Sequence, residues 1–325
     1  APDGRPIYNQ TGRNTYKGGL YTESGGERDV CSVAFSRYFN DGDGSFSAGY
    51  THQDIQELSG MASTTANSSY GKYAASDYNN RTPQRSIYET EHRFFATASS
   101  THYFLGADKP TTFNLYFERK SGLPGTYSWD TYTSRNYGGT AYQQEAFGYE
   151  KNLNDDSSHL LYVPSGVSDP NVCWGSCAAP DLAIAAQVLD TLYNKLGLQG
   201  YAGQIVPNGV YEYPWRTSLD LKITQILPGF RAEDEFVISL GIMNLLNLID
   251  SNKGEAKYGN YNGKMAVLDM FMNDDFTKYI YPNYKGRGYP DYAYGYNSSN
   301  PKGIRKSAVN SIWRAQLGFT YKFSF

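Results

Sequence analysis

Hydrophobic and polar residues alternate along the last fifteen positions of the chain, 311–325. One face contains Trp313, Ala315, Leu317, Phe319, Tyr321, Phe323 and Phe325, and the other contains Arg314, Gln316, Gly318, Thr320, Lys322 and Ser324. A period of two is that of a β-strand. Strands of soluble sandwiches alternate over roughly 4–8 residues, whereas this strand is long enough to cross a bilayer at a tilt, which takes roughly 9–11 residues. The pattern favours a transmembrane β-barrel over the amphipathic strand of a soluble protein.

The same alternation recurs in six earlier segments, at residues 29–39, 45–55, 85–104, 113–118, 213–224 and 236–242. Together these segments predict an all-β, antiparallel transmembrane barrel wall with about seven spanning strands. We expect Leu219, Leu221, Ile238, Leu240, Leu317 and Phe319 to face lipid. We expect Arg216, Asp220, Lys222, Arg314, Gln316 and Lys322 to face the lumen.

The connections between these strands differ in length. Those after Phe39, Phe104 and Phe230 are short, and the others are long. Outer-membrane barrels have short periplasmic turns and long extracellular loops. The asymmetry therefore predicts that the long connections lie outside the cell.

The longest interruption of the strand pattern is residues 121–210. Long loops without secondary structure are uncommon in compact domains, so we expect a small folded extracellular cap. A helix is predicted from Pro180 to Leu196, with Gly197 as its stop. Its predicted apolar face contains Leu182, Ala186, Leu189, Tyr193 and Leu196. Residues 59–82 read as a surface loop, and the apolar island 265–271 reads as a hairpin at the barrel rim.

Composition narrows the possible classes of protein. The chain has 31 Tyr, 16 Phe and 33 Gly but only 5 Met, which favours strands and turns over helices. No run of about 18 apolar residues is present, so a helical membrane span is excluded. A net charge of −3 argues against a nucleic-acid partner. The first residues, 1–4, lack the features of a signal peptide, so we expect either that a leader was removed or that the chain is part of a longer product.

The three cysteines and four histidines suggest little metal chemistry. Cys173 and Cys177 are four residues apart, within reach of a disulfide in an oxidising compartment. Cys31 and the scattered histidines have no zinc-site spacing. The Asp-Gly-Asp-Gly run at 41–44 reads as a turn, because the downstream Glu of a calcium loop is missing. We therefore expect no metal or cofactor.

An enzyme is the least favoured class. The chain has no nucleophile elbow. His92 falls within a strand, where a place in an aromatic girdle or on the lumen face accounts for it. The carboxylates of Glu89, Glu91 and Glu118 are also compatible with a polar lumen face and need no catalytic role. We therefore expect no catalytic residues.

Several segments resemble the C-terminal part of TonB-dependent outer-membrane receptors, and more narrowly their Oar-like branch. They are residues 213–225, the Leu-Pro-Gly-Phe run at 227–230, the Asn-Leu-Leu-Asn region at 241–249, and the closing segment 311–325. Residues 160–165 and 201–207 resemble the same branch. The similarity extends over most of the chain from about Gly12 onward.

The resemblance implies a plug, a TonB box and a barrel of about 22 strands, so the chain would be the C-terminal third of such a receptor. It implies three partners, namely the rest of the receptor, the TonB complex and outer-membrane lipid. It also implies that Phe325 is an assembly signal. The expected function is movement of a solute or peptide across the bacterial outer membrane, and the alternative is a structural or adhesive surface barrel.

Overall fold

The computed structural model describes residues 1–8, 24–58, 64, 69, 73–130, 136–137, 140–141, 147, 159–259, 263–281 and 304–323. Phe325, the expected assembly signal, lies outside these residues. Within them the chain is mainly β-strand, as the sequence predicts. None of the helices in the described ranges is long and apolar enough to span a bilayer.

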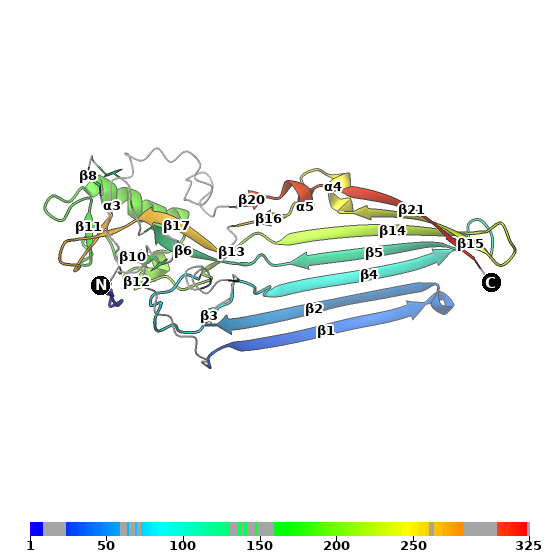
Figure 1. Cartoon of the computed structure of the whole chain (residues 1–325), viewed down its shortest axis with the longest axis horizontal. Helices are drawn as coiled ribbons and strands as arrows, with labels where there is room; N and C mark the ends of the chain where they lie inside the picture. Colours follow the sequence, from blue (N-terminus) through cyan, green and yellow to red (C-terminus); the bar gives the residue numbers. More distant parts are fainter. Residues whose placement is uncertain are drawn as a thin grey trace.

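Seven long strands form one antiparallel sheet in which each strand pairs with the next along the chain (Figure 1). In order across the sheet they are β1 (Glu27–Phe39), β2 (Gly44–Glu57), β4 (His92–His102), β5 (Thr111–Lys120), β14 (Arg216–Pro228), β15 (Glu235–Met243) and β21 (Arg314–Lys322). The short strand β3 (Gln84–Arg85) pairs with β2. Among the described residues β1 and β21 form the two edges of this sheet, so the sheet is open.

The three short connections all lie at the same end of the sheet (Figure 1). The first contains the 3-10 turn η1 (Asn40–Gly42), in which Asn40 and Asp41 have φ of 52° and Gly42 has φ of 105°. Asn, Asp and Gly are the residues that adopt this left-handed conformation most readily. The other two short connections are residues 103–110 and 229–234. The long connections lie at the opposite end, so the predicted asymmetry of connections is present.

The strand register places apolar residues together on one face of the sheet. Ile223 lies opposite Leu240, and Leu240 lies opposite Leu317. None of the buried hydrophobic side chains in the described residues belongs to the seven long strands. Val33 is 65% exposed and Leu317 is 59% exposed. A sheet in a soluble protein packs at least one face against a core, and this sheet leaves its apolar face uncovered.

The buried core lies instead in the cap, beyond the end of the sheet that carries the long connections (Figure 1). A cluster of buried hydrophobic side chains, drawn from sequence positions 127 to 281, forms this core, and we call it the cap core. It is built on β6 (Pro124–Asp130), which pairs in parallel with β17 (Lys264–Asp269) and antiparallel with β9 (His159–Leu160) and β13 (Tyr211–Glu212). Trp129 is fully buried at its centre.

Short elements make up the rest of the described chain, some in the cap and some beside the long sheet. They are β7 (Asn136–Tyr137), β8 (Thr140–Ala141), β10 (Tyr162–Val163), β11 (Val172–Trp174), β12 (Gln204–Ile205), β16 (Lys257–Tyr258), β18 (Phe271–Met272), β19 (Tyr279–Tyr281), β20 (Arg305–Lys306), the helices α4 (Leu245–Ile249) and α5 (Ala308–Ser311), and the 3-10 turn η3 (Gln199–Tyr201). β11 pairs in parallel with β19, which joins residues more than a hundred positions apart.

The predicted cap helix is present, and its predicted apolar face is correct only toward its C-terminal end. It consists of α3 (Leu182–Leu189), whose N-cap is Asp181, followed by the π-helix η2 (Asp190–Lys195). Leu196 is buried in the cap core, and Leu189 and Tyr193 pack against it. Within α3, however, Ile184, Ala185 and Val188 are the buried residues, whereas Leu182 is 65% exposed. The first turns of the helix therefore present the face opposite Leu182 to the core.

The cap also uses more of the chain than residues 121–210. The apolar island at 265–271 is not a hairpin at the rim, because β17 carries it into the cap core beside β6. Tyr73 and Tyr78, from the segment expected to be a surface loop, are buried as well. Parallel pairing of distant segments leaves no local sequence signal, which explains why the periodicity did not reveal it.

Candidate functional site

A groove of about 520 Å³ lies on the polar face of the long sheet. Its walls include Asp220, Lys222 and Gln316, three of the six residues predicted to face the lumen. Asn114 and Tyr116 of β5 and Met243 of β15 line it as well. Residues from six neighbouring strands, β2 to β21, thus meet in one hollow that offers both charge signs and several hydrogen-bonding groups.

The polar face beside this groove is tied together by side-chain contacts across strands. Arg93 Nε donates to Glu118 Oε1 at 2.8 Å, and Lys120 Nζ lies 3.4 Å from Glu118 Oε2. The hydroxyls of Ser36 and Ser47 form a hydrogen bond of 2.7 Å. Such polar ladders satisfy the side chains of a face that no protein core covers.

The other three predicted lumen residues lie outside the groove. Arg216 stands opposite Lys120, and Arg314 stands opposite Met243; both arginines are exposed. Lys322 lies at the turn end of β21 and forms an ion pair of 2.9 Å with Glu235. By strand register all six predicted residues share the polar face, but only Asp220, Lys222 and Gln316 form a common site.

The Asn-Leu-Leu-Asn motif shapes the end of β15 next to this groove. Asn244 has φ of 55°, and its backbone N–H donates to Asp220 Oδ1 at 2.8 Å. Its side-chain amide donates to the backbone oxygens of Gly254 and Ser311. The Asn247 carboxamide oxygen accepts from the backbone N–H of Trp313. The motif therefore joins the ends of β14, β15 and β21, which gives it a structural role.

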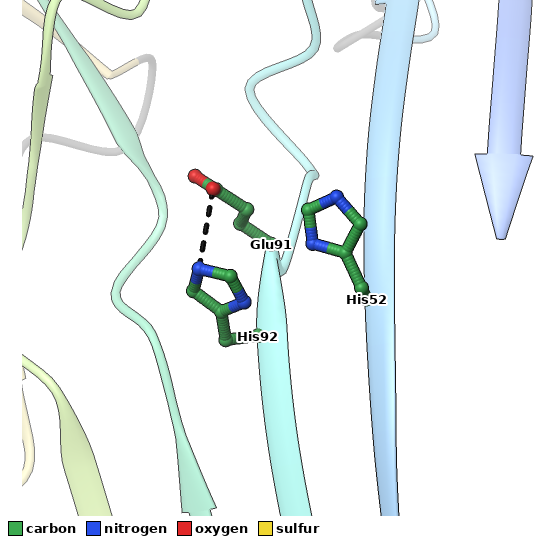
Figure 2. A group of neighbouring side chains, drawn as sticks. All are labelled: His52, Glu91 and His92. Atoms are coloured by element: carbon green, nitrogen blue, oxygen red, sulfur yellow. Dashed lines mark ion pairs between the residues drawn. The ribbon is translucent and has the colours of Figure 1, made fainter. Parts of the chain in front are cut away.

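A second group of polar side chains lies on the opposite face, near the cap end of the sheet. His52 on β2 stands directly across from His92 on β4, and their rings are 5.2 Å apart. Glu91 Oε1 lies 3.2 Å from His92 Nε2. One ligand atom from each of these three residues lies within 4.8 Å of the other two (Figure 2). We call this group the His52–Glu91–His92 cluster.

The two histidines of the cluster differ in their hydrogen bonds. His92 Nδ1 forms a hydrogen bond of 2.8 Å with the Tyr50 hydroxyl. His52 Nδ1 is buried and has no hydrogen-bond partner among the described residues. A buried polar atom without a partner costs roughly 1–3 kcal/mol. Such an atom in a native fold calls for a physical reason.

Acidic side chains surround Arg85 next to the cluster. The guanidinium group contacts Glu89, Glu91 and Glu212 at 2.6, 2.6 and 2.8 Å. The hydrogen bond between Glu91 and Glu212, in which Glu91 is the donor, raises the pKa of Glu91 together with burial. Burial acts to raise the pKa of Glu212, but hydrogen bonds to Glu91 and Arg85 outweigh it and lower that pKa. Three carboxylates around one guanidinium leave this region with excess negative charge.

Aromatic rings enclose the cluster on the side of the sheet. The Trp215 ring stacks on His92 at 5.9 Å, and the Phe94 ring lies 4.7 Å from that of Tyr50. Arg119 lies 5.4 Å from the centre of the Trp215 ring. His92 thus lies among aromatic rings on the face opposite the groove, and not on the polar face.

Sequence reasoning found the groove residues but missed the His52–Glu91–His92 cluster. Alternation alone places Asp220, Lys222 and Gln316 on one face. His52 and His92 are forty positions apart in the chain and meet only through strand register, so spacing along the chain could not reveal them. Only an explicit antiparallel alignment of β2 with β4 could have placed the two histidines opposite each other.

The expected disulfide between Cys173 and Cys177 is present in the cap. Cys173 belongs to β11 and is buried, and the bridge closes the loop that leads to α3. Cys31 is free and exposed on β1, on the apolar face of the sheet.

No family model, no characterised protein and no solved structure matches this chain.

Proposed function

We propose that this chain forms part of the wall and the extracellular cap of a TonB-dependent transporter of the bacterial outer membrane. The observation that carries the proposal is the long sheet itself, which has one apolar and one polar face, neither of them covered by a core among the residues that the structure describes. Lipid is the surrounding that such an apolar face requires, and a water-filled lumen suits the polar face.

The dimensions of the apolar face support this assignment. From Trp215 to Leu227 the face of β14 extends for roughly 40 Å along the strand, or roughly 28 Å when the strand is tilted by about 45°. Aromatic side chains stand at both ends of the face. Tyr50, Phe94 and Trp215 lie at the cap end, and Phe230, Tyr321 and Phe323 lie at the turn end. Aromatic girdles at the two interfaces are typical of outer-membrane barrels.

The open edges support a larger assembly. β1 and β21 both run from the cap end toward the turn end, so they cannot pair with each other in an antiparallel sheet. An antiparallel closed barrel needs an odd number of further strands between them. Completion of the wall by about fifteen strands, as in a barrel of about 22, satisfies this condition. Unpaired edges in hydrocarbon cost several kcal/mol for each orphan backbone group.

The groove on the polar face then opens into the lumen. Asp220, Lys222 and Gln316 would contact a solute or peptide on its way through the barrel. The cap, with its own core, would lie above the pore and contribute to binding from outside.

Cell fractionation and cross-linking to TonB test the proposal together. We expect the protein in the outer membrane, protease added to whole cells to cut within 121–210, and a cross-link to TonB in living cells. Outer-membrane location without any contact with TonB, in cells where another receptor cross-links normally, would favour the structural or adhesive barrel. Recovery in a soluble fraction would refute both.

A further inference from the structure

The His52–Glu91–His92 cluster has the chemistry of a metal site. Its possible donor atoms are two imidazole nitrogens and one carboxylate oxygen, brought together from β2 and from the start of β4. In Figure 2 the His52 ring turns one nitrogen toward Glu91 and His92. His52 Nδ1 is buried without a hydrogen-bond partner in the described part of the chain. A bound cation would give this nitrogen a partner.

We propose that His52, Glu91 and His92 bind a divalent transition-metal ion of the zinc class. Imidazole and carboxylate are common zinc ligands, and three protein ligands leave a fourth position open to water or another ligand. Zinc holds nitrogen and oxygen at about 2.0–2.2 Å in a tetrahedral arrangement, so two of its donor atoms are about 3.3–3.6 Å apart. The donor atoms now lie within 4.8 Å. Small rotations of flexible side chains close the difference.

The Tyr50 hydroxyl allows His92 to change its bonding without moving its ring. The Tyr50 hydroxyl lies 2.8 Å from His92 Nδ1, and His92 Nε2 lies 3.2 Å from Glu91 Oε1. In the tautomer with its proton on Nε2, that N–H faces Glu91 and Tyr50 donates to Nδ1. With metal, Nδ1–H donates to the Tyr50 oxygen and Nε2 presents its lone pair to the ion. Ligating histidines almost always have such a partner on their second nitrogen. The ion would take the place of the proton on Nε2.

Glu91 is held in place for this role by Arg85. Its Oε2 accepts from Arg85 at 2.6 Å, which leaves Oε1 directed at His92. Glu89 and Glu212 share the same guanidinium group, so one positive charge faces three carboxylates. This excess of negative charge offsets the repulsion between Arg85 and an incoming cation. The side chains of Glu91 and His92 remain about one-third exposed, which gives an ion access from solvent.

Titration with Zn²⁺ and Co²⁺ tests the proposal on the protein purified in detergent with any strands that pair with it. We expect one tight Zn²⁺ equivalent, visible-region absorption from Co²⁺ at the same site, and displacement of Co²⁺ by Zn²⁺. His52→Gln and His92→Gln should each weaken Zn²⁺ binding at least tenfold. Tyr50→Phe removes only the partner of His92 and should weaken binding by about 10–100-fold, the usual effect of such partners.

His102→Gln is the matched control, because His102 is an exposed histidine at the other end of β4. It should bind both ions like the unaltered protein. Equal heat-modifiability on gels will show that all variants assemble. Metal binding that His52→Gln and His92→Gln leave unchanged, or unaltered protein that gives no Co²⁺ absorption, would overturn the assignment. Neither result bears on transport, because the cluster lies on the face opposite the groove.

Discussion

The guanidinium carbon of Arg5 lies 4.5 Å from the centre of the Trp129 ring, deep within the cap. Arg5 is buried, and it donates hydrogen bonds to Asp3 and to the backbone oxygen of Leu160. The first residues of the chain are therefore part of the cap core. Burial acts to raise the pKa of Asp3, but the charge and hydrogen bonds of Arg5 outweigh it and lower that pKa.

Removing Arg5 alone should destabilise the cap strongly. Arg5→Met leaves the Asp3 carboxylate buried without its counter-charge, at an expected cost of about 3–5 kcal/mol. Asp3→Asn added to Arg5→Met should recover part of this loss, because the remaining group is neutral. Hydrogen exchange of the β6 and β17 amides will report the opening free energy of the cap. A double variant as unstable as Arg5→Met would contradict the ion-pair explanation.

Acidification should loosen the cap through His159. Burial, followed by the charges of Arg5 and Lys264, lowers the pKa of His159 well below its ordinary value. The unfolded chain takes up a proton below about pH 6.5, whereas the folded cap keeps His159 neutral. Its contribution to stability is thus present above pH 6.5 and is lost as the pH falls, by about 1.4 kcal/mol per unit.

The measurement is the opening free energy of the cap by hydrogen exchange at pH 7.5 and pH 5. We expect the opening free energy to fall between pH 7.5 and pH 5, because the unfolded chain protonates His159 and the folded cap does not. His159→Phe keeps an aromatic ring near Phe147, 4.2 Å from the present imidazole, and should reduce the pH dependence. His102→Phe, outside the cap core, should leave it unchanged. If the opening free energy changed equally with pH in the two variants, His159 would not be the group responsible.

The small disulfide ring in the cap should contribute modestly. Loop entropy gives about 2 kcal/mol for a bridge that closes so short a segment. We expect the Cys173→Ser and Cys177→Ser double variant to lower the opening free energy of β11 and α3 by about that amount. Exchange in β17, across the cap core, provides the internal comparison. Unchanged protection of β11 after loss of the bridge would mean that packing of Trp174 alone holds this segment.

Sequence alternation could predict the long sheet because each of its strands pairs with its neighbour along the chain. Leu240 and Leu317 lie on one face of the sheet independently of how the cap folds, because the alternation of a strand determines the face of every residue. The cap follows another rule. Its central pair, β6 and β17, is parallel and joins Thr126 to Lys264. Only tertiary packing selects this pairing, so Met265 could not be assigned to the cap core from the local pattern.

The same contrast explains the two sites. Asp220 and Lys222 belong to one strand, and their face follows directly from alternation. The His52–Glu91–His92 cluster requires the register between β2 and β4, in which a shift by one residue would place the two histidines on opposite faces. The face of α3 could not be chosen for a third reason, because both Leu182 and Ile184 are apolar and only packing against the cap core decides which of them is buried.

Two neighbouring positions on β21 test which face meets lipid. Leu317 and Gln316 are both exposed and lie on opposite faces, so lysine at either position disturbs little packing within the chain. Leu317→Lys should cost roughly 2–4 kcal/mol if it lies near the bilayer midplane. Gln316→Lys should stay within about 0.5 kcal/mol. The yield of heat-modifiable protein in outer membranes measures the difference, and equal yields would show that the register or the lipid assignment is wrong.

The open edges lead to a prediction for residues 1–325 expressed alone. β1 and β21 run in the same direction, so the seven strands cannot close on themselves as an antiparallel barrel. Each unpaired edge group would lie in hydrocarbon at a cost of several kcal/mol. In detergent the isolated chain should therefore give no heat-modifiable, protease-resistant monomer. Co-expression with the strands that flank β1 and β21 in the complete protein should restore the resistant form. A closed, stable barrel formed by the chain alone would disprove the proposal that most of the wall comes from elsewhere.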